Sequence, residues 1–245
     1  MDPHAHLPAD PHRDADCEPD PAPPGPSGRR PALVVLVCAL GVLSILAWAV
    51  ARGNAHLLAT DLRIETWWHA RVADPWIETM VLASALGKPV TVITGAVAVA
   101  AGLAWTGARG LRLWLWASIP LAVLGNQVLK RSLERARPQL EHPLQTLESF
   151  SFPSGHAVGS TVFYGLLAMW MIRNTRDRAH RFLAIVVACL LVLLICFSRV
   201  YLGVHYPSDV LAGMSEGIAW LALCAMLLAR STAPGHRMPP RRRGP

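Results

Sequence analysis

Charged residues are scarce in this chain of 245 residues. Asp, Glu, Lys and Arg together make up 16% of it, whereas 53% of the residues are hydrophobic. A composition this apolar excludes an ordinary water-soluble domain, and the length excludes a simple membrane anchor. Lysine is nearly absent, with only Lys88 and Lys130, while Arg, Ala and Pro abound. We associate that bias with a GC-rich bacterial genome.

Cysteine is also rare, and its placement excludes a disulfide framework. Four of the five cysteines lie within apolar runs and the fifth, Cys17, lies in a polar stretch near the start. No even set stands at loop spacings, so we expect no bridges that staple an outer domain.

Long apolar runs are what the chain does have. A transmembrane helix needs about 20 mainly apolar residues. Six stretches come close to that length: Ala32 to Val50, Pro89 to Ala108, Leu113 to Leu129, His156 to Ile172, Phe182 to Ser198 and Val210 to Ala229. The sequence therefore predicts an all-α, polytopic membrane protein with six transmembrane helices.

The arginines predict its orientation. Although the net charge is +7, the basic residues collect at span ends and tails instead of forming a nucleic-acid-binding stripe, so no nucleic-acid partner is expected. The groups are Arg29 and Arg30, Arg109 and Arg112, Arg173 to Arg181, and Arg241 to Arg243. All four fall on one side of a six-span protein, and the positive-inside rule makes that side the cytoplasm. Both termini are then cytoplasmic; the alternative is an inverted orientation.

Three regions follow along the chain. Residues 1–30 are rich in proline and acids and are expected to form a disordered cytoplasmic tail. Residues 31–230 form the six-helix domain, and residues 231–245 form a basic cytoplasmic tail. The first span lacks a convincing cleavage site and is expected to remain as an anchor. Between spans one and two, residues 54–88 show the spacing of an amphipathic helix, which either lies on the outer membrane face or packs across the bundle.

A first polar block follows the third span. Lys130 and Arg137 are seven residues apart, a spacing that returns to one helix face after two turns, and Pro138 would end that helix. Both cations can then face one phosphate, with Arg137 as a planar fork and Lys130 as a point charge. Alone, the pattern better fits a basic cluster on anionic lipid.

A second block opens the fourth span with Pro153, Ser154, Gly155 and His156. Ser154 can cap the helix, and Gly155 allows a ligand to approach the backbone closely. The amides of a helix N-terminus bind phosphate, and His156 could deliver a proton to a leaving oxygen. Alone, the block also fits a capped helix with an interfacial histidine.

The third block lies between the fifth and sixth spans. Arg199 is followed by His205, and Asp209 comes four residues after that histidine. A carboxylate that accepts a hydrogen bond from one imidazole nitrogen directs the lone pair of the other outward and makes it a nucleophile. Alone, these residues fit an interfacial histidine and a helix-capping aspartate.

Together, the three blocks resemble the type 2 phosphatidic acid phosphatase (PAP2) family, also called the lipid phosphate phosphatases. The resemblance covers residues 55–230 and fills every motif position. It implies a lipid phosphate or diphosphate as substrate, no metal or other cofactor, and hydrolysis through a phosphohistidine at the extracytoplasmic face. It also implies that His205 is the nucleophile, oriented by Asp209, and that His156 is the general acid and base. The residues implied to bind the phosphoryl group are Lys130, Arg137, Ser154, Gly155 and Arg199.

Several alternatives stay open. Undecaprenyl diphosphate, phosphatidate and phosphatidylglycerophosphate are all candidate substrates. A phosphotransferase would use the same phosphohistidine, and a non-catalytic lipid-binding protein is a further class. Vanadium haloperoxidases share a similar pocket, but six spans argue against that use. Glu216 has no place in the family pattern, and we expect it to have a structural role, such as pairing with Asn126 or Gln127. Asn126, one turn before Lys130, is also expected to position that lysine.

Overall fold

The computed structural model describes residues 29–102, 109–139 and 147–231, and every regular element in these ranges is an α-helix. The helices are α1 (Arg29–Ala51), α2 (Ala55–His69), α3 (Asp74–Ala85), α4 (Pro89–Gly102), α5 (Arg109–Leu133), α6 (Gly155–Asn174), α7 (Arg178–Tyr201) and α8 (Pro207–Ser231). The all-α prediction is confirmed over the described residues.

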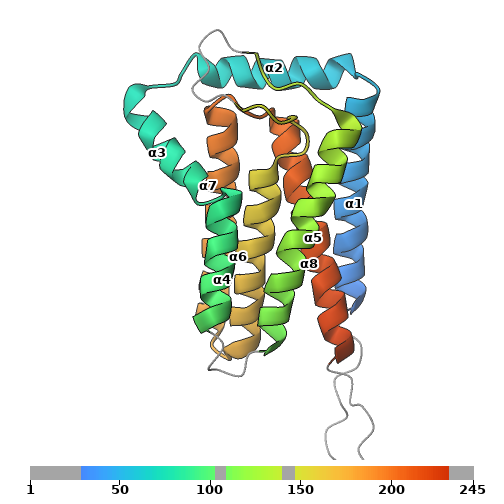
Figure 1. The fold of residues 1–245 in the computed structure, drawn as a ribbon, viewed down its shortest axis with the longest axis vertical. Coiled ribbons are helices and arrows are strands. Elements are labelled where there is room, and N and C mark those ends of the chain that lie inside the picture. The colour runs from blue at the N-terminus through green and yellow to red at the C-terminus, as the bar shows by residue number, and fades with distance from the viewer. Residues whose placement is uncertain (1–28, 103–108, 140–146, 232–245) are drawn as a thin grey trace, which may run out of the picture.

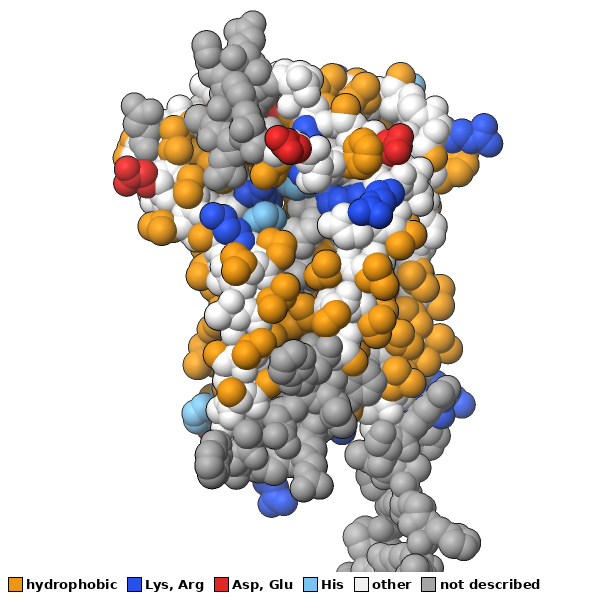
Figure 2. Space-filling model, in the orientation of Figure 1, with side chains coloured by type: hydrophobic (Ala, Val, Ile, Leu, Met, Phe, Trp, Pro, Cys, Tyr) orange, Lys and Arg blue, Asp and Glu red, His pale blue; other side chains and the backbone are white. Residues whose placement is uncertain are grey.

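Six of these helices form an elongated bundle. In Figure 1, α1, α4, α5, α6, α7 and α8 run roughly parallel, and α2 lies across one end. Buried apolar side chains from α4, α5, α6 and α8 form the core, with Val92, Ile119, Val162 and Cys224 among them. Large apolar side chains also cover the outside of the bundle, where a soluble protein would be polar. Figure 2 shows them as a broad band along its length.

Four described helices are long and apolar enough to cross a bilayer, namely α1, α6, α7 and the first 22 residues of α8. The pair α3 and α4 makes a fifth if it counts as one span, although it bends by 49° at residues 86–88. The chain is thus an integral membrane protein by its helices, while the count of six spans stays a prediction. Part of the expected second span, residues 103–108, lies outside the described residues.

The helix α2 presents an unexpected face to the bundle. Its apolar side chains Leu58 and Leu62 are 43% and 41% exposed, while Asp61 and Glu65 are buried. We expected an amphipathic helix here; the helix exists, but acids instead of leucines point inward. The physical reason is a set of polar partners beneath Asp61, described below.

The predicted cytoplasmic arginines and the basic residues of the three polar blocks lie at opposite ends of the bundle. The start of α1, the end of α8 and the α6–α7 connection lie together at the end opposite α2 (Figure 1). The predicted groups at Arg29 and Arg30 and at Arg173 to Arg181 are therefore on one side, and the three polar blocks lie on the other. The expected tails lie almost wholly in residues 1–28 and 232–245, outside the described residues.

Candidate active site

The three polar blocks meet beneath α2, at the ends of four helices. Lys130 stands in the last turn of α5, Ser154 immediately before α6, Arg199 in the last turn of α7, and Asp209 in the first turn of α8. Each of these four side chains is at most 5% exposed. Buried charges at this density need partners, and they find them in the segment between α5 and α6 and in Ser84 of α3.

Two of the cations surround residues 149–151 of that segment. Lys130 Nζ donates to the Phe150 carbonyl at 2.7 Å, and Arg137 donates to the Phe150 carbonyl at 3.2 Å and the Ser149 carbonyl at 2.6 Å. The expected shared helix face is wrong, because α5 ends at Leu133 and Glu134 takes a φ of 45°. The two cations nevertheless converge, because the chain turns back on itself after the helix.

His205 lies between Arg137 and Asp209. Its Nδ1 is 3.5 Å from Asp209 Oδ2 and 3.4 Å from Ser151 Oγ, while Nε2 is 3.2 Å from Arg137 Nη1. Ser151 Oγ also donates to Asp209 Oδ2, as does the Tyr206 amide at 3.0 Å. Burial lowers the pKa of His205 to about 4, more than the adjacent Asp209 raises it. The imidazole is therefore neutral at pH 7 and can offer a lone pair at Nε2.

The N-terminus of α6 faces the same space. Ser154 occupies the N-cap position, but its side chain makes no capping bond, so the expected cap is wrong in its chemistry. Its Oγ and the Nε2 of His156 are both buried without a hydrogen-bond partner among the described residues. The first amides of a helix have no partner within it. Two orphan side-chain groups beside such amides form a site for an anion with several oxygens.

Arg199 reaches this region from α7. It is 1% exposed, and its Nη1 donates to Ser84 Oγ near the end of α3. The bend after α3 brings Gly87 against the His156 ring, where an added Cβ would lie 3.4 Å from Cδ2 and 2.5 Å from a methyl group of Ile195. The bend thus packs against both α6 and α7 beside His156.

Glu216 is paired as expected. Asn126 Nδ2 donates to Glu216 Oε2 at 3.2 Å and to the Pro153 carbonyl at 3.4 Å. This contact links α5 and α8 to the segment before α6, in accordance with a structural role. No hydrogen bond joins Asn126 to Lys130 within the described ranges, and the positioning of that lysine by Asn126 stays a prediction.

Four residues at the site lie outside the predicted motif positions. They are Asp61, Ser84, Arg135 and Ser151. Ser151 stands close to Pro153, and proximity to that block could have drawn attention to it. Asp61 and Arg135 are 74 residues apart, and Ser84 and Arg199 are 115 apart, so no local pattern connects them.

No three His, Cys, Asp or Glu side chains in the described parts of the chain form a group that could hold a metal ion. Three buried or partly buried cations, Lys130, Arg137 and Arg199, surround the pocket instead. The fold and the site define an integral membrane protein with a cluster of buried and partly buried cations at one end of its helical bundle. His205 lies beside these cations, with its Nε2 3.2 Å from Arg137 Nη1.

The chain belongs to the PAP2 superfamily, because the family model matches residues 111–233, half of the chain. Among curated relatives, it is 39% identical over 94 residues to phosphatidylglycerophosphatase B of Bacillus subtilis, covering 38% of this chain and 46% of the relative. It is 32% identical over 137 residues to lipid A 1-phosphatase of Rhizobium johnstonii, covering 52% and 50%. The aligned parts thus span about half the length of these relatives.

The fold has a solved counterpart. The crystal structure of a transmembrane PAP2-type phosphatidylglycerolphosphate phosphatase from Bacillus subtilis superposes with a TM-score of 0.70 at 29% sequence identity. The match covers 80% of this chain and 94% of that chain. The resemblance predicted from the three blocks is confirmed, and these relatives are hydrolases of phosphate esters.

Proposed function

We propose that this protein is a membrane phosphatase that hydrolyses a lipid phosphate monoester or diphosphate. The observation that carries the proposal is the environment of His205, whose Nδ1 faces Ser151 and Asp209 while Nε2 lies 3.2 Å from an arginine of the anion pocket. That arrangement orients a neutral imidazole and points its second nitrogen at the place where a phosphoryl group would bind.

The reaction would proceed in two displacements. His205 Nε2 attacks phosphorus, and the bond between phosphorus and the lipid oxygen breaks with its electron pair on that oxygen. His156 supplies the proton that the leaving oxygen takes up. A water then attacks the phosphohistidine, His156 accepts its proton, and the P–N electron pair returns to His205.

The cations would act on the charge of the phosphoryl group. Arg137 and Arg199 offer several N–H donors each, while Lys130 adds a third positive charge. The Ser154 hydroxyl and the amides at Gly155 would bind the remaining oxygens. With three cations at the pocket, we expect activity to persist in a chelator.

The relatives and the arginine groups support a substrate class and an orientation. Phosphatidylglycerophosphate is the first candidate, because relatives with that activity match this chain in sequence and in fold. Phosphatidate and undecaprenyl diphosphate present the same terminal phosphate. We further propose that α4 and α5 complete six spans, and that the arginine-rich end faces the cytoplasm and the pocket faces outward.

The test is phosphate release by the purified, detergent-solubilised protein in EDTA, on phosphatidylglycerophosphate, phosphatidate and undecaprenyl diphosphate. His205→Ala should abolish release, and denatured wild-type enzyme should carry an acid-labile, alkali-stable label after brief exposure to ³²P-substrate. His180→Ala is the matched control, because that histidine is exposed at the opposite end of the bundle. It should retain full activity.

Either of two results would count against the proposal. Release that is indifferent to His205 would exclude the phosphohistidine route. Failure on all three lipids, with the protein folded, would exclude the proposed substrate class.

A further inference from the structure

Asp61, on the inner face of α2, makes three polar contacts directly above the pocket. It is 2% exposed, and its Oδ1 accepts from the Ser208 amide at 3.0 Å while Oδ2 accepts from the Ser208 hydroxyl. Arg135 Nη2 donates to the same Oδ2 at 2.8 Å. Ser208 immediately precedes Asp209, so Asp61 holds the backbone that presents the catalytic carboxylate.

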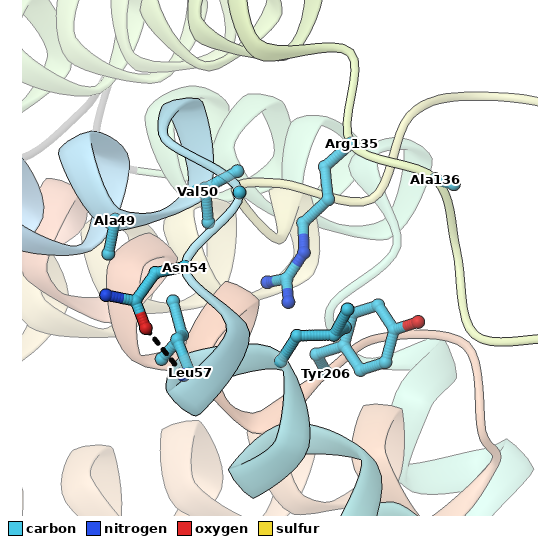
Figure 3. Close-up of a pocket in the computed structure, with 9 residues that line it drawn as sticks. Ala49, Val50, Asn54, Leu57, Arg135, Ala136 and Tyr206 are labelled. Atoms are coloured by element: carbon cyan, nitrogen blue, oxygen red, sulfur yellow. Dashed lines mark hydrogen bonds between the residues drawn. The ribbon is translucent and has the colours of Figure 1, made fainter.

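Arg135 links Asp61 to Asp209 directly. Its Nη1 donates to Asp209 Oδ1 at 2.6 Å and to Ser208 Oγ at 2.8 Å, and its guanidinium lies over the Tyr206 ring, 4.3 Å from the centroid. Figure 3 shows Arg135 and Tyr206 beside a cavity of about 270 Å³ that opens between the α1–α2 turn and the segment after α5. A single cation is thus shared by two buried carboxylates.

The charges determine what Asp209 can do for His205. Alone with Arg135, the Asp209 carboxylate would be neutralised, and its attraction for a positive imidazole would be largely cancelled. With Asp61 on the other side of the guanidinium, the three groups carry one net negative charge. That charge stabilises the cationic imidazole that forms when His205 bonds to phosphorus.

We infer that Asp61 is a positioning residue for the reaction: by balancing Arg135 and holding Ser208, it keeps the Asp209 carboxylate oriented and negatively charged toward His205. This inference rests on the proposed function, because it requires His205 to be the nucleophile. It gives α2 a role in the chemistry, although the three polar blocks contain no residue of this helix.

Other charged groups also act on Asp209 and His205. They come from several elements: Glu65 on α2, Lys130 on α5, Arg135 and Arg137 after it, and His156 on α6. Glu65 is 1% exposed, and burial, followed by the charges of Asp61 and Asp209, raises its pKa to about 7. Asp61 is the acid of α2 that contacts Arg135 and Ser208.

The first test is Asp61→Asn, which keeps the size and removes the charge. We expect kcat to fall 10- to 100-fold while KM changes less than threefold, because Asp61 contacts no substrate. We also expect the acid limb of the kcat/KM profile to move to lower pH by about one unit, since a less negative partner lowers the pKa of His205. Glu78 is an exposed residue of α3, and Glu78→Gln is the matched control. It should change neither kcat nor the acid limb of the pH profile.

A double-mutant cycle separates positioning from packing. If Asp61 acts by balancing Arg135, the pair Asp61→Asn with Arg135→Gln should lose no more activity than the worse single variant. If the two substitutions acted independently, their fold-losses in activity would multiply in the double variant. Trp68→Ala, which weakens the packing of α2 on Phe197 without removing a charge, should lower the melting temperature and leave the pH profile in place.

The result that overturns the inference is an Asp61→Asn variant with an unmoved acid limb, or losses that multiply in the cycle. If Asp61→Asn does not fold in detergent, Arg135→Lys replaces it, because a lysine keeps the charge but cannot reach both carboxylates. Its kcat must then fall at constant KM. Failure of the proposed function is distinct, since it shows as activity that survives His205→Ala whatever the Asp61 variants do.

Discussion

Gly213 on α8 packs against the start of α6. Its replacement by alanine should push the two helices apart and so displace the site residues that they carry. An added Cβ would lie 2.5 Å from the Ser154 carbonyl oxygen and 2.9 Å from Ala157 Cβ. The Ser154 amide also donates to the Asp209 carbonyl at 3.0 Å, so the two helices are joined at this point. Relief of the clash to an ordinary 3.4 Å requires α6 and α8 to separate by about 0.9 Å.

That displacement acts on both stability and catalysis. Overpacking of this kind costs about 1–3 kcal/mol, which should appear as a lower melting temperature. A misplacement of about 1 Å at a catalytic group can reduce the rate roughly 100-fold. We therefore expect Gly213→Ala to fold but to release phosphate 10- to 100-fold more slowly than the wild type, with His156 and Asp209 moved apart.

Gly159→Ala is the matched control. Its added Cβ would meet only the methyl groups of Val92, at 3.8 and 4.0 Å, which is ordinary contact. Alanine is favoured over glycine inside a helix by roughly 1 kcal/mol, so this variant should melt no lower than the wild type and keep its activity. A Gly213→Ala protein with wild-type rate and melting temperature would refute the role of this helix contact.

Three further predictions concern single groups. Ser84→Ala removes a hydrogen-bond partner of the buried Arg199. It should lower kcat/KM roughly 10- to 100-fold, because hydrogen bonds to charged groups contribute about 1.5–3 kcal/mol. Ser118 is also buried but remote from the site, so Ser118→Ala should not lower kcat/KM. The pKa of His205 is lowered to about 4, so the unfolded state binds a proton more tightly than the folded state does. The free energy of unfolding should therefore fall by about 2 kcal/mol between pH 7 and pH 5. In chemical denaturation, the His205→Asn variant should not show this loss. Conversely, the raised pKa of Glu65, about 7, means that its contribution is present at low pH and lost as the pH rises through 7. Glu65→Gln should therefore gain stability over the wild type at pH 8 relative to pH 5, and an equal difference at both values would contradict this assignment.

The membrane helices were predictable because apolar runs are a local property. The expected spans at 32–50, 156–172, 182–198 and 210–229 fall inside α1, α6, α7 and α8, which extend one to four residues beyond each end. The polar blocks were predictable for a similar reason, since each holds its residues within a dozen positions. Their meeting at one end of the bundle follows from alternating helix directions.

Long-range pairing was not predictable. The end of α5 at Leu133 depends on a left-handed backbone at Glu134, for which glutamate gives no signal. The inward face of α2 is set by Arg135, which is distant in the sequence from Asp61. A periodicity analysis assigns leucines to the core, and it fails where a buried cation attracts acids more strongly than the core attracts Leu58.

The position of the pocket at the end of the apolar band also bears on the cost of substrate capture. Withdrawing a lipid into water exposes its chains at about 0.8 kcal/mol for each CH₂, which is more than ten kcal/mol for a common acyl chain. In Figure 2, a group of cationic and histidine side chains lies between the apolar band and the end of the bundle that carries α2. With the band in the hydrocarbon, this group would lie at the depth of the lipid headgroups. A substrate could arrive by lateral diffusion within its leaflet and leave the same way, with its chains never leaving the hydrocarbon. Encounter would then depend on the mole fraction of the lipid in the membrane and not on its concentration in water.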